Sequence, residues 1–177
     1  MKIPSSVISN PLVLIKTQLG GIEVEVYEEE APVTATNFLR YVDNKLYDGT
    51  TFFRTVTMEN QPSAQVKIEV IQGGQVDKQR EYPPIEHETT QMTRLSHLDA
   101  VISMARTKPG GAASSFFICI GDQPELNFGG HRNPDGQGFA AFAKVVIGMD
   151  VVRSIHTQPR EGQRLTPPIR ILSAARL

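Results

Sequence analysis

The sequence lacks several features that would place it in a functional class at once. Its 177 residues include one cysteine, Cys119, which excludes an internal disulfide and a cysteine-rich metal site. It also lacks an excess of charge, because 18 lysine and arginine residues stand against 19 aspartate and glutamate residues and the formal net charge is −1. Nucleic-acid-binding surfaces usually need a basic excess, so we expect no nucleic-acid partner.

Long apolar runs are absent as well. No stretch approaches the roughly 18 apolar residues that a membrane-spanning helix requires, and Pro4, Asn10 and Pro11 interrupt the short apolar segments near the N-terminus. We therefore expect a soluble protein without a membrane partner, in the cytoplasm or the periplasm. A signal peptide removed ahead of Met1 is compatible with the sequence.

The common catalytic motifs are missing too, since the chain has no GxSxG, P-loop, HExxH or GxGxxG sequence. Cys119 lies in the apolar segment FFICI, which favours a buried thiol over a nucleophile. The histidines lie in four separate segments, without the spacing of a zinc motif: His87, His97, His131 and His156. We expect neither a metal nor a cofactor.

The composition that remains is that of an ordered globular protein, 40% hydrophobic and 21% charged. A chain of this length supports one hydrophobic core, so we predict a single domain over residues 1–177. The balanced charge is compatible with a monomer.

The N-terminal third predicts a hairpin and a helix. Residues 12–27 form two apolar-rich stretches around Gly20-Gly21. In the second stretch glutamates alternate with apolar residues, as in a strand with one solvent-exposed face. A helix follows, because apolar residues recur at helical spacing at Ala35, Phe38, Leu39, Val42 and Leu46. Thr34 is the expected N-cap, and Asp48-Gly49 the expected stop.

The rest of the chain is mainly β. Short strands are predicted at residues 50–56, 66–71, 100–105, 115–120, 139–146 and 169–174, with a second helix at residues 150–156. Many short strands with two helices favour a closed barrel over a parallel α/β sheet.

Residues 121–138 form the longest irregular segment, rich in glycine and containing two prolines. A loop of this length inside a compact domain is usually functional or mobile. Asn127 and residues 133–138 offer oxygen atoms that could bind calcium, but the segment has few carboxylates. Ordinary turn chemistry is the preferred interpretation of Asn-Pro-Asp-Gly.

Several segments together carry a family resemblance. They are, in chain order, APVTATNFLRYV, YDGTTFFRTV, VIQGG, AVISMAR, SSFFICIGDQPELN and FAAFAKVVIGMDVV, and the resemblance runs from about residue 12 to residue 174. In this order the segments resemble the cyclophilin family, and the sequence looks like a divergent, bacterial-type member. The resemblance implies a closed eight-stranded antiparallel barrel capped by two helices. It also implies a cofactor-independent peptidyl-prolyl cis/trans isomerase that assists folding by acting on proline-containing polypeptides.

The resemblance assigns two catalytic residues. Arg54, in FFR, matches the catalytic arginine, and Gln72, in IQGG, matches the glutamine that orients it. Alone, Arg54 would be read as a solvated strand arginine. The following Gly73 and Gly74 would permit a sharp turn and a close approach.

The resemblance also gives a set of expected substrate-binding residues. Phe117 matches the floor of the proline pocket, Leu126 matches its wall, and Ala105 lies where main-chain groups bind the peptide. Alone, Phe117 would be read as a core residue. The complete predicted set is Val70, Ala105, Ser115, Phe117, Leu126 and Phe139.

Several expected pocket residues are changed. Glu69 and Val70 replace Phe-Met, and strand alternation predicts that Val70 shares a face with Gln72 while Glu69 points away. Met58 is interpreted as filling part of the gap. The remaining replacements are Arg106 for asparagine, Ser115 for glutamine, Glu125 for tryptophan and Phe139 for histidine.

These replacements leave alternatives to a fully active isomerase open. One is a catalytically weakened proline-peptide-binding or chaperone module of the same fold. Another is a barrel that holds a small apolar ligand inside. A cyclosporin-type ligand is expected to bind with reduced affinity, because its usual tryptophan contact is replaced by Glu125.

Overall fold

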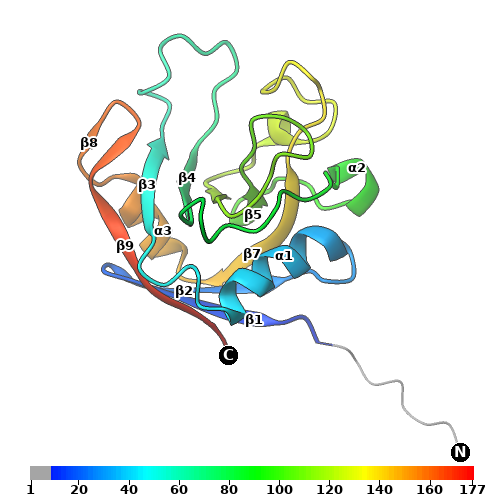
Figure 1. Cartoon of the computed structure of the whole chain (residues 1–177). Helices are drawn as coiled ribbons and strands as arrows, with labels where there is room; N and C mark the ends of the chain where they lie inside the picture. Colours follow the sequence, from blue (N-terminus) through cyan, green and yellow to red (C-terminus); the bar gives the residue numbers. More distant parts are fainter. Residues whose placement is uncertain (1–8) are drawn as a thin grey trace, which may run out of the picture.

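The computed structural model describes residues 9–177, and the first eight residues of the predicted domain lie outside the described part. Figure 1 shows a closed antiparallel β-barrel. Its ring contains, in spatial order, β1 (Leu12–Thr17), β2 (Gly20–Val26), β7 (Ala140–Ile147), β5 (Val101–Met104), β6 (Phe116–Cys119), β4 (Val70–Gly73), β3 (Thr51–Val56) and β9 (Arg164–Arg176). Pairing of β9 with β1 closes the ring, and the two-residue β8 (Arg160–Glu161) pairs with β9 alone. The predicted eight-stranded barrel is confirmed.

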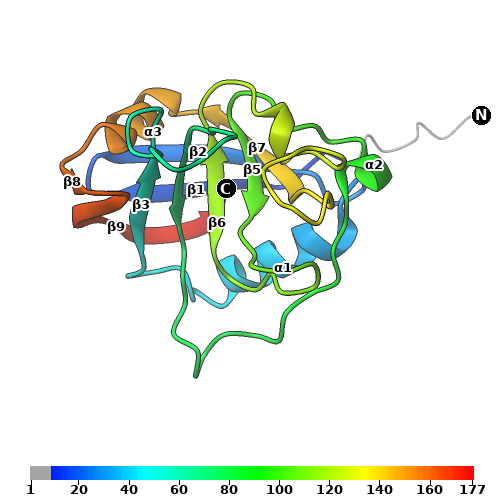
Figure 2. The ribbon, with the colours of Figure 1, turned by 90° about the horizontal axis from the view of Figure 1, so that it is seen from above.

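Two principal helices, α1 (Pro32–Asp43) and α3 (Met149–His156), lie on opposite sides of the barrel (Figure 2). Both were expected from the sequence. The described chain also contains the four-residue α2 (Thr90–Thr93) and the 3-10 helix η1 (Pro124–Leu126), which the sequence analysis missed. A single turn with one apolar side chain, Met92, has no periodicity from which a helix could be detected.

Some predicted boundaries were wrong. The strand expected at residues 66–71 begins only at Val70, because the side chain of Gln61 takes both backbone groups of Ile68. Gln61 Nε2 donates to the Ile68 carbonyl at 2.7 Å, and the Ile68 N–H donates to Gln61 Oε1 at 3.2 Å. The last strand, expected at residues 169–174, extends from Arg164 to Arg176.

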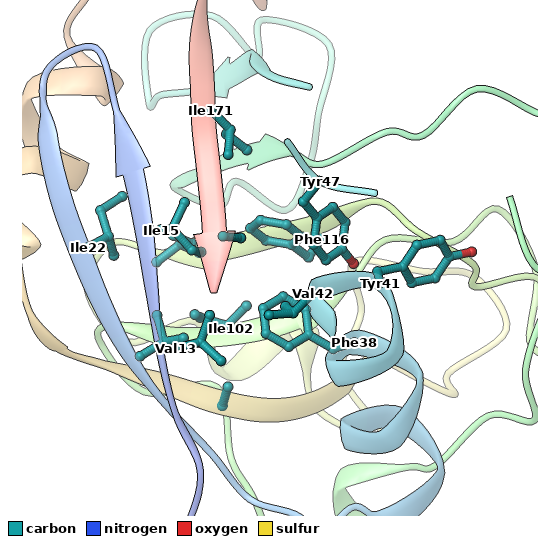
Figure 3. Packing of buried hydrophobic residues seen from close by; sticks show 14 of the residues in the cluster. Val13, Ile15, Ile22, Phe38, Tyr41, Val42, Tyr47, Ile102, Phe116 and Ile171 are labelled. Atoms are coloured by element: carbon teal, nitrogen blue, oxygen red, sulfur yellow. The ribbon is translucent and has the colours of Figure 1, made fainter. Parts of the chain in front are cut away.

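Apolar side chains fill the interior of the barrel (Figure 3). Ile22, Val24 and Val26 are fully buried, as their alternation with glutamates predicts. Phe38 of α1 meets Phe116 of β6 edge to face, with ring centroids 5.6 Å apart. This continuous packing is that of a solid core, and it rejects the hypothesis of a small ligand held inside the barrel.

The start of α1 depends on a distant carboxylate and not on the predicted N-cap, Thr34. The helix begins at Pro32, and the N-cap position is occupied by Ala31, which offers no side-chain acceptor. Glu88, 7% exposed, accepts hydrogen bonds from the N–H groups of Val33 and Thr34, at 3.2 and 2.7 Å, and from the Thr34 hydroxyl. Free N–H groups and the helix dipole both favour an anion at this end.

A buried histidine joins the loop of residues 121–138 to the barrel. His97 is 1% exposed, and its Nδ1 and Nε2 lie 2.8 Å from Asn127 Oδ1 and from the Ser103 hydroxyl. The neutral ring satisfies both contacts, because Nδ1–H donates to the amide oxygen and Nε2 accepts from the hydroxyl. Burial lowers the pKa of His97 to about 4, and the bond to Asn127 opposes this only in part.

We expect Glu88→Ala to lower the free energy of unfolding by about 2 to 3 kcal/mol, because it leaves buried donors of α1 without an acceptor. Glu86→Ala, at an exposed position of the same segment, is the control and should change it by less than about 0.5 kcal/mol. Urea denaturation measures both. Equal losses in the two variants would show that Glu88 does not cap the helix.

We also expect acid to destabilise the protein through His97. The unfolded state takes up the proton near pH 6.5, whereas the folded state does so only near pH 4. Stability contributed by the neutral ring is therefore complete above pH 6.5 and is lost as the pH falls toward 4, by about 3 kcal/mol in total. Urea denaturation across this range should show a weaker pH dependence for His97→Gln than for the wild type. Parallel slopes for wild type and His97→Gln would contradict this role of His97.

Candidate active site

A second apolar cluster lies on the outer face of β3, β4 and β6, separate from the interior core. Its buried members are Val56, Ile68, Val70, Phe117, Cys119 and Leu126. Val70 stands directly between Val56 and Cys119 in the strand register, so three neighbouring strands build one apolar floor. The same strands send their alternate side chains into the core.

A cavity of about 450 Å³ opens above this floor. All eight residues that the sequence analysis singled out line it: Arg54, Val70, Gln72, Ala105, Ser115, Phe117, Leu126 and Phe139. The structure thus brings together residues of β3, β4, β6 and η1 with residues that directly flank β5, β6 and β7, while their catalytic and binding roles stay predictions. The loops of residues 57–69 and 121–139 lie on the same side of the barrel, at the top of Figure 1.

The strand register places Arg54, Gln72 and Phe117 in one row. Arg54 of β3 pairs with Gln72 of β4, which pairs with Phe117 of β6. The register of β3 shifts between Phe52 and Arg54 against both of its neighbours. Such a bulge redirects side chains, so Phe52 is buried in the core while Arg54 faces the outer cavity.

Two neutral amides hold the Arg54 guanidinium. Its Nη1 donates to Gln72 Oε1 and its Nε donates to Gln163 Oε1, both at 2.9 Å. Arg54 forms no ion pair with any residue between 9 and 177, so its charge is fixed in place without being neutralised. Burial lowers the pKa of Arg54, and the nearby charge of Arg132 lowers it further.

A hydrogen bond on the side away from Arg54 fixes the orientation of the Gln72 amide. Its Nε2 donates to the Ser115 hydroxyl at 3.0 Å, and that hydroxyl lies 3.2 Å from the Gly73 carbonyl. The Gln72 oxygen is therefore left to face Arg54. A Cβ on Gly73 would lie 2.7 Å from the Thr51 carbonyl oxygen, and Gly74 has a φ of +75°, which confirms the expected close approach and turn.

The aromatic floor is fixed on two sides. Phe117 meets Phe139 edge to face at 5.2 Å, and it stacks on His97 at 6.1 Å with an interplanar angle of 12°. Leu126, contributed by η1, is fully buried beside it. The result is a rigid apolar recess next to a positive charge.

The replacement Arg106 ties the long loop to the barrel. Its side chain is 1% exposed, pairs with Asp135 at 2.9 Å, donates to the Gly138 carbonyl and lies over the Phe139 ring. The bonds from Arg106 lower the pKa of Asp135. The only carboxylate of residues 133–138 is thus engaged by an arginine, in agreement with the preferred interpretation of this segment as turns and not as a calcium site.

Other replacements point away from the cavity. The Glu125 carboxylate accepts from the N–H and Nδ1 of His131, both at 2.8 Å, and these bonds lower the pKa of Glu125. Glu69 lies 3.8 Å from His156 and is absent from the cavity wall, as strand alternation predicts. The interpretation of Met58 was wrong: it is 50% exposed and outside the wall, whereas Ile68 lines the cavity.

Sequence reasoning missed two residues of the site. Gln163 lies 109 residues from Arg54 along the chain, in the turn before β9. Arg132 lines the cavity from the long loop and donates through Nη1 to Gln61 Oε1 at 3.0 Å and to the Val66 carbonyl at 2.7 Å. Neither residue belongs to a motif, so no local signal could have identified it.

Cys119 is fully buried, and burial raises the pKa of its thiol far above the usual range, which confirms the prediction that it is not a nucleophile. Between residues 9 and 177 no three histidine, cysteine, aspartate or glutamate side chains gather in a way that could hold a metal ion. Within the same residues no helix has the length and apolarity to cross a membrane.

Comparison with known proteins adds sequence relatives of known activity. A peptidyl-prolyl cis-trans isomerase of Acinetobacter baylyi is 36% identical over 162 residues, which are 89% of this chain and 78% of the relative. Peptidyl-prolyl cis-trans isomerase B of Escherichia coli is 34% identical over 149 residues, which are 81% of this chain and 83% of the relative.

Solved structures agree in fold. A cyclophilin type peptidyl-prolyl cis-trans isomerase of Cryptosporidium parvum aligns with a TM-score of 0.73 at 20% identity, covering 95% of this chain and 98% of that one. The same protein in the presence of the dipeptide ala-pro gives a TM-score of 0.72.

The family-level match covers nearly the whole chain. Residues 12–176 match the family described as "Cyclophilin type peptidyl-prolyl cis-trans isomerase/CLD". With the closed barrel and the bacterial relatives, this match shows that the chain belongs to the cyclophilin family of peptidyl-prolyl cis/trans isomerases.

Proposed function

We propose that Arg54 is the catalytic residue of this peptidyl-prolyl cis/trans isomerase. Resonance gives the peptide bond a rotational barrier of about 18 to 20 kcal/mol, and rotation about an Xaa-Pro bond is slow although both isomers are accessible. In the twisted transition state the prolyl nitrogen regains its lone pair. A guanidinium that donates to this lone pair binds the transition state more tightly than either planar ground state.

The observation that carries this proposal is the way in which Arg54 is held. Gln72 and Gln163 fix the guanidinium at 2.9 Å each and, being neutral, leave its charge available to the substrate. Nη2 has no hydrogen-bond partner among residues 9–177, so a donor is free at the cavity. Gln72 and Ser115 then act as positioning residues, because the serine hydroxyl fixes the orientation of the Gln72 amide and this amide fixes the orientation of the Arg54 guanidinium.

The apolar floor supports a role in binding the proline ring. Val70, Phe117, Leu126 and Phe139 offer an apolar recess beside Arg54, which suits a ring with no polar atom beyond its own nitrogen. Ala105, directly after β5, would bind the residue before the proline through its main-chain carbonyl, because its N–H already donates to the Ser115 carbonyl at 2.9 Å.

The substrates in this proposal are proline-containing segments of unfolded or partly folded polypeptides. The chain would act as a single domain over residues 1–177, as a monomer and without a cofactor. The compartment, cytoplasm or periplasm, stays a prediction from composition. The alternative function is a module that binds proline-containing peptides but hardly accelerates their isomerisation. A measurement of the isomerisation rate distinguishes it from the enzyme.

We expect Arg54→Ala to lower kcat/KM for a proline-containing peptide by about 100-fold, because it removes the one donor that serves the transition state. The control is Arg170→Ala, an exposed arginine on the neighbouring strand β9, and it should stay within about twofold of the wild type. Equal rates for wild type and Arg54→Ala would reject the role of Arg54. If the wild type binds the peptide but does not accelerate its isomerisation, the result favours the binding module.

We expect cyclosporin-type ligands to bind with a Kd above the nanomolar range, because the carboxylate of Glu125 is directed to His131 and replaces a large apolar contact. Isothermal titration should show that Glu125→Trp lowers Kd by about tenfold. Glu86→Trp, at an exposed position outside the cavity wall, should not. Nanomolar affinity of the wild type would contradict the prediction.

A further inference from the structure

Two arginines face the same cavity close to each other. Arg54 and Arg132 both line it, and the charge of Arg132 is the nearby charge that acts on Arg54. Two like charges in one partly buried place repel each other, so an anion bound at Arg132 would relieve this repulsion. The mechanism proposed above requires only Arg54, which leaves Arg132 without an assigned role.

The acidic side chains around this part of the molecule are already engaged elsewhere. Glu125 binds His131, Asp135 binds Arg106, and Glu59 lies 3.5 Å from Arg160. The carboxylate in the cavity wall, Glu81, accepts hydrogen bonds from Ser114 and from Gln75. Within residues 9–177, neither Arg54 nor Arg132 has a carboxylate within ion-pair distance.

Arg132 is held in a way that leaves part of its guanidinium available. Both of its side-chain hydrogen bonds use Nη1, to the Gln61 amide oxygen and the Val66 carbonyl. These partners are uncharged and fix the side chain against the loop of residues 57–69. Nε and Nη2 have no partner in the described part of the chain, so the planar group can still donate to an incoming carboxylate.

The direction of the peptide follows from the proposed function, on which this inference rests. If Ala105 binds the residue before the proline and Arg54 reaches the prolyl nitrogen, the chain continues beyond Arg54. Ala105 adjoins β5, whereas Arg132 bonds to Gln61 and Val66 in the segment that joins β3 to β4, so Arg132 lies on the Arg54 side of the cavity. The first side chain to meet its guanidinium would be the one that follows the proline.

We propose that Arg132 is a specificity-determining residue that selects substrates with an acidic side chain, aspartate or glutamate, directly after the proline. The carboxylate completes an ion pair that the protein itself leaves open. Because the site is partly open to solvent, the preference is modest and falls as salt screens the charges.

The test measures cis/trans exchange by NMR on three peptides with blocked termini, Ala-Ala-Pro-Glu-Ala, Ala-Ala-Pro-Gln-Ala and Ala-Ala-Pro-Lys-Ala. Blocking removes the terminal carboxylate, which would otherwise compete for Arg132. For the wild type, kcat/KM should be about fivefold higher for the Glu peptide than for the Lys peptide, with the Gln peptide between them. The ratio should shrink toward one at about 0.5 M salt.

Variants assign the preference to one residue. Arg132→Gln should bring the Glu-to-Lys ratio close to one, and Arg132→Lys, which keeps the charge, should retain most of it. Lys16→Gln removes one charge from an exposed position on β1, across the barrel, and should leave the ratio at the wild-type value.

The outcomes separate the two proposals. A wild type that isomerises the Gln peptide well but treats the Glu and Lys peptides alike overturns the role of Arg132 and leaves the proposed function intact. A preference that survives Arg132→Gln overturns it as well. A wild type that isomerises none of the three peptides overturns the proposed function and this inference together.

Discussion

An arginine held by amides is the constraint on which the rest of the site depends. A carboxylate partner would fix Arg54 equally well, but it would neutralise the charge on which the proposed mechanism relies. Gln72 and Gln163 fix it without doing so, and they flank β3 on its two sides, Gln72 on β4 and Gln163 in the turn before β9. Ser115 orients Gln72 in turn, so a chain of uncharged groups holds a single charge in place.

The barrel wall serves two purposes at once. One face of β3, β4 and β6 packs on the aromatic interior around Phe116, and the other carries the smaller cluster around Phe117. The bulge in β3 allows consecutive segments of one strand to serve both faces, since Phe52 enters the core and Arg54 the cavity. The loops form a wall above the sheet, which the strands alone cannot provide. The ion pair between Arg106 and Asp135 holds this wall in place.

The sequence predicted those parts of the molecule that depend on local pattern. Strand alternation and helical spacing are read within a few neighbouring residues, and they favoured a closed barrel. Arg54, Gln72 and Phe117 were assigned only through the joint resemblance of several segments to the cyclophilin family. Contacts between distant residues were not predictable in this way. Glu88 caps a helix 54 residues away in place of Thr34, and Gln61 takes the backbone bonds that would have begun β4 earlier. Gln163 and Arg132 join the site only because the fold places them there.

The position of the cavity on the outside of the closed ring determines how a client reaches it. A ligand held inside a barrel must enter through one end, whereas a surface on β3, β4 and β6 can be approached from the side. A polypeptide needs no free terminus to dock there and need not be threaded. Under the proposed function, a proline in the middle of a long chain, or at the tip of a loop that protrudes from a half-folded protein, would be as accessible to Arg54 as one in a short peptide.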